Sequence, residues 1–263
     1  MTSTVLNRSH RQDTTHHTRS IGRLLREQEP GHQPPTFDPW MVADLPEPAR
    51  QWLTHAIEPG TLLAEAIEIQ MHGAILLGKW RPFTATQALV PDAGLVWAAR
   101  TRIAGLPVRG SDSYVLGQGA MRWRVLGIVP VQSGTGYDVT RSAADRLAAE
   151  AVLLPTSLVS ATWRDGERPD EAVYVRQVGN RTISVTIRAT EDGRLLSAAM
   201  QRWGNPGGGQ HRQHGFEVSF GAEFSCHGIA LPDVFAASWI DEGGRRREFL
   251  RAELDRADLC LAN

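Results

Sequence analysis

The feature that most constrains the fold is a change of hydrophobic period near residue 62. Before that point, residues 46–57 carry an apolar stripe at helical spacing, which includes Trp52 and Leu53, and Glu58-Pro59-Gly60 ends it. After that point, apolar and polar residues alternate in short segments separated by turn sequences such as Pro91-Asp92-Ala93-Gly94. Short alternating segments with regular turns and few helices predict an antiparallel meander rather than a parallel α/β sheet.

One clear helix interrupts the strands, over residues 141–154. Ala143, Leu147, Ala151 and Leu154 share one face, and further alanines widen it, so the helix can approach a sheet closely. We expect Asp138 or Thr140 to cap its N-terminus and Pro155 to end it.

The chain divides into a tail and a folded part. Residues 1–39 are rich in Ser, Thr, His, Arg, Gln and Pro, and such a composition predicts a disordered N-terminal tail. Residues 40–263 then form a single antiparallel β domain. The closing stretch, residues 247–259, has good helix formers, but its place in a terminal hairpin favours a strand.

Composition and charge exclude several classes of function. The net charge of −1 and the pI near 6.8 argue against binding of nucleic acid. Cys226 and Cys260 are the only cysteines, with no CxxC, and therefore predict neither a disulfide framework nor a metal site, and no cofactor is expected. No run approaches the roughly 18–20 apolar residues of a membrane helix, and no secretory signal begins the chain, so we expect a cytoplasmic protein.

Standard catalytic motifs are missing from the sequence. It contains no GxSxG, HExxH, P-loop or GxGxxG pattern at a strand–helix junction. Gly117-Gln118-Gly119 lies between two predicted strands and is interpreted as a hairpin turn.

The segment 110–124 is the most informative for chemistry. Asp112 and Tyr114 share one sheet face, and Arg122 and Arg124 share a face of the following strand. Across the hairpin these side chains form either a polar cluster on a concave face, fit for acid–base chemistry or anion binding, or a row of surface ion pairs. Glu150 on the central helix is the third candidate catalytic group, unless it only pairs with Arg146 four residues earlier.

Tryptophans are numerous, with eight in the chain, and three fall in the early strands. Trp80, Trp97 and Trp123 either line a pocket for an apolar ligand or fill the core. With Arg122, Arg124 and Leu147 of the central helix, they make up the expected ligand-binding set.

Several runs resemble a bacterial family of unknown function, over roughly residues 45–259. The resemblance rests on Gly78-Lys79-Trp80-Arg81-Pro82-Phe83, Asp112-Ser113-Tyr114, Gly117-Gln118-Gly119-Ala120-Met121-Arg122-Trp123-Arg124, Leu147-Ala148-Ala149-Glu150 and Phe249-Leu250-Arg251-Ala252-Glu253. It implies an architecture similar to the curved half-barrels of bacterial lipoprotein carriers, in which a bent antiparallel sheet wraps a helix and encloses an apolar cavity. The implied fold class is α+β, predominantly antiparallel β, with a curved sheet packed on one central helix and an N-terminal helix.

Three functions are compatible with these observations. The first is binding of a hydrophobic small molecule or lipid in a cavity between sheet and helix. The second is an enzyme, a cyclase, isomerase or hydrolase, acting on a hydrophobic substrate in the same cavity. The third is an interaction protein that recruits a partner through its N-terminal tail. Burial of Asp112 or Glu150 inside the cavity with a perturbed pKa would favour the enzyme.

Overall fold

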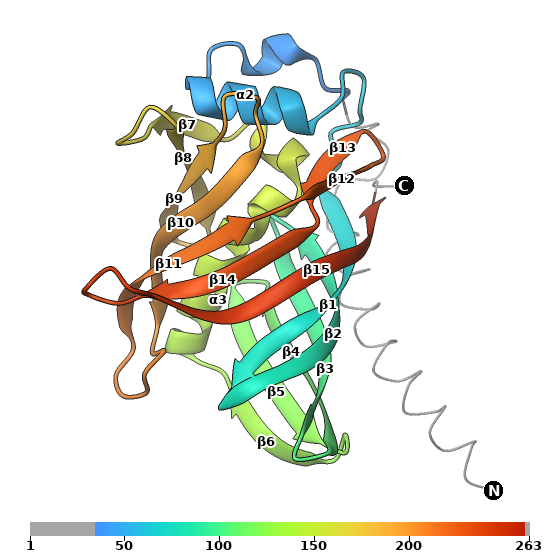
Figure 1. The fold of residues 1–263 in the computed structure, drawn as a ribbon, viewed down its shortest axis with the longest axis vertical. Coiled ribbons are helices and arrows are strands. Elements are labelled where there is room, and N and C mark those ends of the chain that lie inside the picture. Colours follow the sequence, from blue (N-terminus) through green and yellow to red (C-terminus); the bar gives the residue numbers. More distant parts are fainter. Residues whose placement is uncertain (1–34, 261–263) are drawn as a thin grey trace, which may run out of the picture.

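The computed structural model describes residues 35–260, which fold around one antiparallel sheet of 13 strands. The sheet is strongly bent and wraps around α3 (Tyr137–Glu150), so that it forms a half-barrel (Figure 1). A second helix, α2 (Glu47–Ala56), lies across one end of the sheet. The predicted class, α+β and predominantly antiparallel β with one central and one N-terminal helix, is confirmed.

Two meanders make up the large sheet. The first contains β1 (Ala66–Leu77), β2 (Lys79–Val90), β3 (Gly94–Ile103), β4 (Leu106–Val115), β5 (Gln118–Val125) and β6 (Val129–Gly134). The second contains β7 (Thr162–Asp165), β8 (Glu171–Val178), β9 (Arg181–Ala189), β10 (Leu195–Gly204), β11 (Arg212–Phe220), β14 (Val234–Ile240) and β15 (Arg246–Cys260). A separate hairpin is made of β12 (Glu223–Cys226) and β13 (Ile229–Pro232), and the short 3-10 helices are η1 (Pro39–Val42), η2 (Ala151–Leu153) and η3 (Pro155–Leu158).

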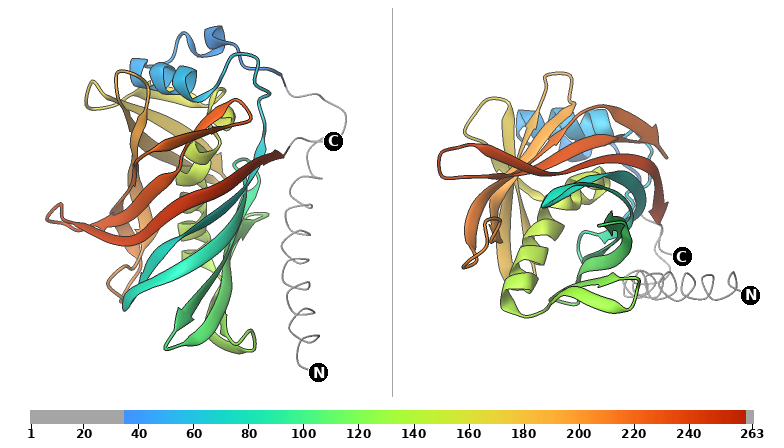
Figure 2. Two further views of the ribbon diagram at one scale, coloured as in Figure 1. Left: turned by 45° about the vertical axis from the view of Figure 1, so that its right-hand side comes forward. Right: turned by 60° about the horizontal axis from the view of Figure 1, so that its bottom comes forward.

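The strand order explains why a helix occupies the concave side. It runs β6-β5-β4-β3-β2-β1-β15-β14-β11-β10-β9-β8-β7, so β1 and β15 join the two meanders, and β6 and β7 are the edges. The chain passes from one edge to the other through α3, η2 and η3. Because the sheet curves, the shortest such path crosses its open side, as the end-on view shows (Figure 2). This topology places α3 between β5 and β10.

The central helix begins earlier and ends earlier than the sequence predicts. It starts at Tyr137 after Gly136, whose φ of 95° suits glycine, and it stops at Glu150, where η2 continues the path. Neither predicted cap residue lies at the N-cap, since Asp138 is already inside the first turn. Its carboxylate instead accepts a hydrogen bond from Trp203 Nε1 at 2.8 Å.

Gly119 lets α3 lie directly on β5. A Cβ at this position would lie 2.5 Å from Thr140 Cα, a backbone atom of the helix. The two elements are also joined by a hydrogen bond of 3.0 Å from the Gly119 backbone N–H to Thr140 Oγ1. Leu116 and Gly117 form the preceding two-residue turn, both with positive φ, so the predicted hairpin is confirmed and its second glycine has a packing role.

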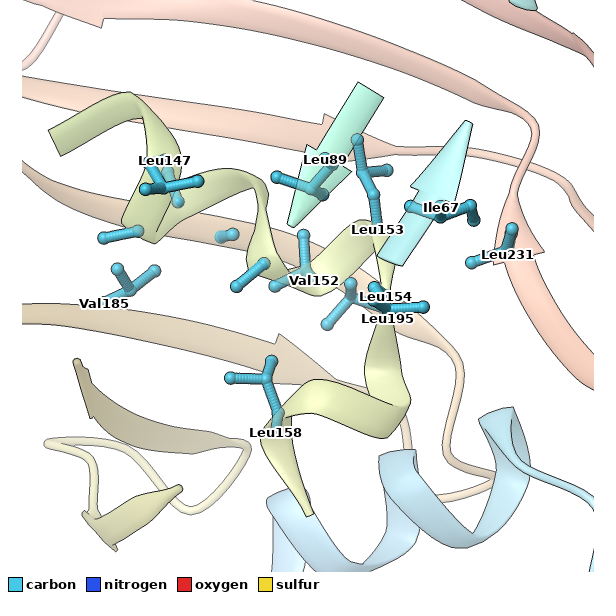
Figure 3. Packing of buried hydrophobic residues seen from close by; sticks show 14 of the residues in the cluster. Ile67, Leu89, Leu147, Val152, Leu153, Leu154, Leu158, Val185, Leu195 and Leu231 are labelled. Atoms are coloured by element: carbon cyan, nitrogen blue, oxygen red, sulfur yellow. The ribbon is translucent and has the colours of Figure 1, made fainter. Parts of the chain in front are cut away.

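The apolar core fills the half-barrel at the C-terminal end of α3. Leu147, Val152, Leu154 and Leu158 point from the helical segment towards both meanders (Figure 3). Their partners on the strands include Ile67, Leu89, Val185 and Leu195, and all these side chains are at most 2% exposed. Beyond them, α2 contributes Trp52 and Leu53 and closes this end against β8, β9 and β13.

The described part of the chain includes folded residues before the predicted boundary at Trp40. Phe37 is 1% exposed, and its backbone N–H donates to the Thr61 carbonyl at 2.7 Å, so burial of one aromatic side chain fixes this segment. The rest of the predicted tail, residues 1–34, lies outside the described residues. At the other end, residues 246–260 form β15, which confirms the strand. Within residues 35–260, no helix is long and apolar enough to cross a membrane.

Candidate functional site

A cavity of about 1330 Å³ lies between the first turns of α3 and both halves of the bent sheet. It is partly open to solvent and occupies the end of the half-barrel that the core leaves unfilled. Its walls mix apolar and ionisable groups. The wall residues on which the chemistry depends are Asp112, Met121, Arg146, Arg202, Trp239 and Phe249.

Arg146 and Glu150 form a half-buried ion pair on the inner face of α3. Arg146 Nε donates to Glu150 Oε1 at 2.6 Å, and Gln87 Nε2 donates to Glu150 Oε2 at 2.7 Å. The Arg146 guanidinium also lies over the Trp97 ring, 5.1 Å from its centre. Glu150 is thus saturated by neighbours and does not line the cavity, in agreement with the predicted pairing to Arg146.

Asp112 lies in the cavity wall on β4. One of its oxygens accepts a hydrogen bond of 3.0 Å from Trp123 Nε1, and Arg146 Nη1 lies 3.7 Å from the other. The indole of Trp123 reaches this position because Gly110 lies opposite, where a Cβ would meet the ring at 2.2 Å. Burial raises the pKa of Asp112, although Arg146 and the Trp123 N–H favour the charged form. About a third of the side chain, 32%, still faces open space.

Arg202 on β10 is a cation without a matching anion. Its Nε is buried with no hydrogen-bond partner, and no carboxylate of residues 35–260 forms an ion pair with it. The guanidinium instead lies over two aromatic rings, 4.7 Å from the centre of Phe216 and 5.2 Å from that of Trp239. Burial and the charge of Arg146 lower the pKa of Arg202 to about 10, so it remains protonated at neutral pH. The cavity wall therefore carries a guanidinium that no carboxylate of residues 35–260 contacts directly, although the charges of Glu150, Asp145 and Asp112 favour its protonated form.

The predicted hairpin cluster is only partly formed, because of the strand register. The two-residue turn at Leu116-Gly117 pairs Asp112 with Met121 and Ser111 with Arg122. Arg122 and Arg124 therefore lie on the outer face, exposed, while Asp112 points inwards. Asp112 therefore lies on the concave side, as the alternative of a concave polar cluster required. The arginine beside it, however, is Arg146 of α3 and not Arg122 or Arg124 of the hairpin.

Three other predicted site residues do not line the cavity. Trp80 is 39% exposed on the outer face of β2, where the Arg251 guanidinium lies 4.7 Å from its ring centre. Leu147 and Tyr114 are core residues at 2% and 5% exposure, because their positions face the packed end of the half-barrel. These placements correct the predicted ligand-binding and catalytic sets.

Trp97 and Trp123 point to the concave side, as predicted for a pocket, but they lie behind the cavity wall. Their ring centres are 5.9 Å apart, and they hold Arg146 and Asp112 in place. Their role is thus to support the polar groups that do line the cavity.

Arg202 is the charged wall residue that sequence reasoning missed, and Met121, Trp239 and Phe249 were missed with it. Ala198, Met200 and Arg202 share one face of β10, and the first two are buried. In the sequence, Arg202 follows two apolar residues at the spacing of inward-facing strand positions. This pattern could have indicated an arginine that points into the half-barrel. No cluster of three His, Cys, Asp or Glu side chains within residues 35–260 is arranged to hold a metal ion.

Comparison with known families agrees with the sequence resemblance. The profile of a family of unknown function (DUF6920) matches residues 43–258. The chain belongs to DUF6920. The match covers α2 and almost the whole of the large sheet, including every cavity residue named above, and it confirms the expected membership of a family of unknown function. A search of the curated proteins finds no significant match for this DUF6920 chain.

Two solved bacterial structures are among those similar to the DUF6920 chain. One is a putative outer membrane lipoprotein-sorting protein domain from Vibrio parahaemolyticus, with 9% identity, a TM-score of 0.40 and coverage of 74% of this chain and 85% of that one. The other is a LolA superfamily protein from Nitrosomonas europaea, with 10% identity, a TM-score of 0.38 and coverage of 82% and 91%.

Proposed function

We propose that the protein binds an amphipathic small molecule or lipid in the cavity beneath α3, and that Arg202 pairs with an acidic group of this ligand. Met121, Trp239 and Phe249 supply apolar and aromatic surface for the hydrophobic part. A volume of about 1330 Å³ is ample for such a molecule.

The observation that carries the proposal is the unpaired Arg202 in the cavity wall. A buried cation is costly unless an anion or hydrogen-bond acceptors compensate its charge. Asp112 does not pair with Arg202, because its two carboxylate oxygens face Trp123 Nε1 and Arg146 Nη1. A carboxylate or phosphate on the ligand would pair with the charge of the Arg202 guanidinium, which lines the cavity.

Two probes of equal length test the proposal. A dansyl-labelled fatty acid and the corresponding dansyl-labelled alcohol differ only in the charged head, so their dissociation constants isolate the contribution of the anion. We expect the acid to bind the full chain at least about tenfold more tightly than the alcohol, because a charge-assisted hydrogen bond is lost with the alcohol. The preference should disappear in Arg202→Gln.

Arg194→Gln is the matched control, since Arg194 is 59% exposed and pairs with Asp192 away from the cavity. It should retain the preference for the acid. Failure of both probes to bind the wild-type chain, or equal binding of acid and alcohol, would contradict the proposal.

A second candidate function, catalysis on a hydrophobic substrate, is favoured by Asp112. A cavity-wall carboxyl with a raised pKa is suited to general acid–base chemistry in a cyclisation, isomerisation or hydrolysis. If Asp112 is catalytic, molecules bound to the purified wild type and to Asp112→Asn should differ as product and substrate. Identical bound masses in the two proteins would remove this candidate.

A further inference from the structure

Three hairpin turns gather at the open end of the first meander. They are the turns β1–β2 at Gly78, β3–β4 at Ala104-Gly105 and β5–β6 at Leu126-Gly127. Because consecutive strands reverse direction, alternate turns come to the same end, the lower end of the molecule in Figure 1. The Leu126 backbone N–H donates to the Pro107 carbonyl at 2.9 Å and ties two of these turns together.

These turns expose large apolar side chains to solvent. We call the set the hairpin rim: Leu77, Trp80, Leu106, Leu126, Ile128 and Val129. Ile128 is 78% exposed, and the others range from 39% to 56%. Turn residues are usually polar. Exposed apolar side chains gathered at neighbouring turns therefore indicate a surface that contacts a membrane or another protein.

The charge within the three turn segments of the hairpin rim has a single sign. Segments 76–82, 102–109 and 122–132 contain six basic residues, Lys79, Arg81, Arg102, Arg109, Arg122 and Arg124, and no acidic residue. None of the six belongs to an ion pair within the described part of the chain. The chain as a whole has a net charge of −1, so this is a local excess. The β14–β15 turn, by contrast, mixes Asp241 and Glu242 with arginines.

We propose that the hairpin rim docks on the surface of an anionic lipid bilayer. Apolar turn side chains enter the interfacial region, where Trp80 is also well suited to lie, and the surrounding cations reach lipid phosphates. The alternative of a second copy seated rim to rim is opposed by repulsion between two positive surfaces. An anionic bilayer can bury the apolar side chains and, at the same time, place lipid phosphates beside the unpaired cations.

The hairpin rim is continuous with the cavity. Leu77 belongs to the rim and also lines the cavity mouth. Docking would therefore bring the opening towards the bilayer, so that an amphipathic molecule moves between membrane and cavity with little exposure to water. The docking itself does not depend on the identity of the ligand, and it can be tested separately.

Flotation of the full chain with vesicles tests the docking. Vesicles of phosphatidylcholine mixed with phosphatidylglycerol should carry the protein upwards at low salt. Vesicles of phosphatidylcholine alone, or a high salt concentration, should reduce the bound fraction strongly. The double variant Leu126→Asn/Ile128→Ser should lower the partition coefficient by roughly tenfold or more, because it removes two of the inserted side chains. Asn is chosen at residue 126 because it tolerates the φ of 54° there.

The matched control lies at the other end of the same strands. Leu116 precedes a glycine in an equivalent turn, with φ of 52° and 50% exposure, so Leu116→Asn makes the same chemical change away from the rim. It should float like the wild type, and so should Arg202→Gln. No binding to anionic vesicles, or equal loss with Leu116→Asn, would overturn the proposal. A dimer in light scattering that only Leu126→Asn/Ile128→Ser dissociates would overturn it in favour of a second copy.

Discussion

Asp112 has a protonation state that depends on the fold. Its ordinary pKa is 3.8, and burial raises the pKa in the native protein. The folded chain therefore holds this proton more tightly than the unfolded chain does. The contribution of Asp112 to the free energy of unfolding must then fall as the pH rises from 3.8 through the raised pKa, because this group binds more protons in the native state over that interval.

Asp112→Asn isolates this contribution. The amide oxygen can still accept from Trp123, but residue 112 no longer titrates. Urea denaturation at a series of acidic pH values should show the wild type losing free energy of unfolding relative to the variant as the pH rises above 3.8. A difference that is constant with pH, or that grows in the opposite direction, would show that Asp112 is not desolvated in the native state.

Asp145 is the buried carboxylate that anchors α3 to the second meander. Its side chain is 1% exposed, Arg181 Nη1 lies 2.7 Å from one oxygen, and the other accepts from the Trp203 backbone N–H at 2.7 Å. Asp145→Ala leaves the Trp203 backbone N–H without its acceptor and Arg181 without its carboxylate, so that Arg181 Nη1 keeps only the Arg141 carbonyl at 3.2 Å. We expect it to lower the free energy of unfolding by about 3 kcal/mol.

Chemical denaturation measures this loss. Glu242→Ala, which removes an exposed carboxylate paired with Arg212, should leave the free energy of unfolding nearly unchanged. Equal effects of the two substitutions would mean that burial of the Asp145 pair contributes nothing.

The sequence predicts the positions of some site residues better than those of others. Asp112 was identified as a candidate because strand alternation and a short hairpin place it within one informative segment, but the sequence left open which face of the sheet it takes. Arg202 was not, because its neighbour Arg146 is brought close only by the tertiary fold, with 13 strands arranged around α3. The outward position of Arg122 and Arg124 depends on a single-residue register, which the turn at Leu116-Gly117 decides and the pattern of charges does not.

The contact between α3 and β5 is the element packing on which the cavity depends. Gly119→Ala would force a methyl group against the Thr140 backbone, where the nearest atom lies 2.5 Å away, so the helix must shift. We expect a loss of about 2 kcal/mol in the free energy of unfolding, and weaker binding of the dansyl-labelled fatty acid.

Gly207→Ala is the control, since a Cβ there meets no atom within 4 Å and its φ is not in the left-handed region. It should change neither stability nor binding appreciably. If Gly119→Ala is as well tolerated as Gly207→Ala, α3 does not rest on β5 as described.

Element type was easier to predict than element limits. Alternation identified the strands, and the alanine-rich face identified the central helix, because both periods are set by local geometry. The start of α3 was predicted late because Asp138 and Thr140 are good cap residues, yet their side chains bond to Trp203 and Gly119 in other elements. Tertiary hydrogen bonds therefore overrode the local preference.

The overall architecture follows from joining two meanders through the first and last strands. With β1 beside β15, the edges β6 and β7 lie far apart, and α3 must cross between them. The sequence indicated strands and two helices, whereas the bent sheet was implied by resemblance, since hydrophobic period carries no information on curvature. The cavity exists because the packed core ends partway along α3 and leaves its first turns facing open space.

Native mass spectrometry of the full-length purified protein tests the central claim most directly. If the cavity beneath α3 holds an acidic amphiphile, the wild type should retain a bound molecule that carries a carboxylate or phosphate and an apolar chain. Arg202→Gln should retain much less of it, and Arg194→Gln as much as the wild type. A wild-type protein that carries no such molecule, and that takes none up when incubated with the dansyl-labelled fatty acid, would contradict the account.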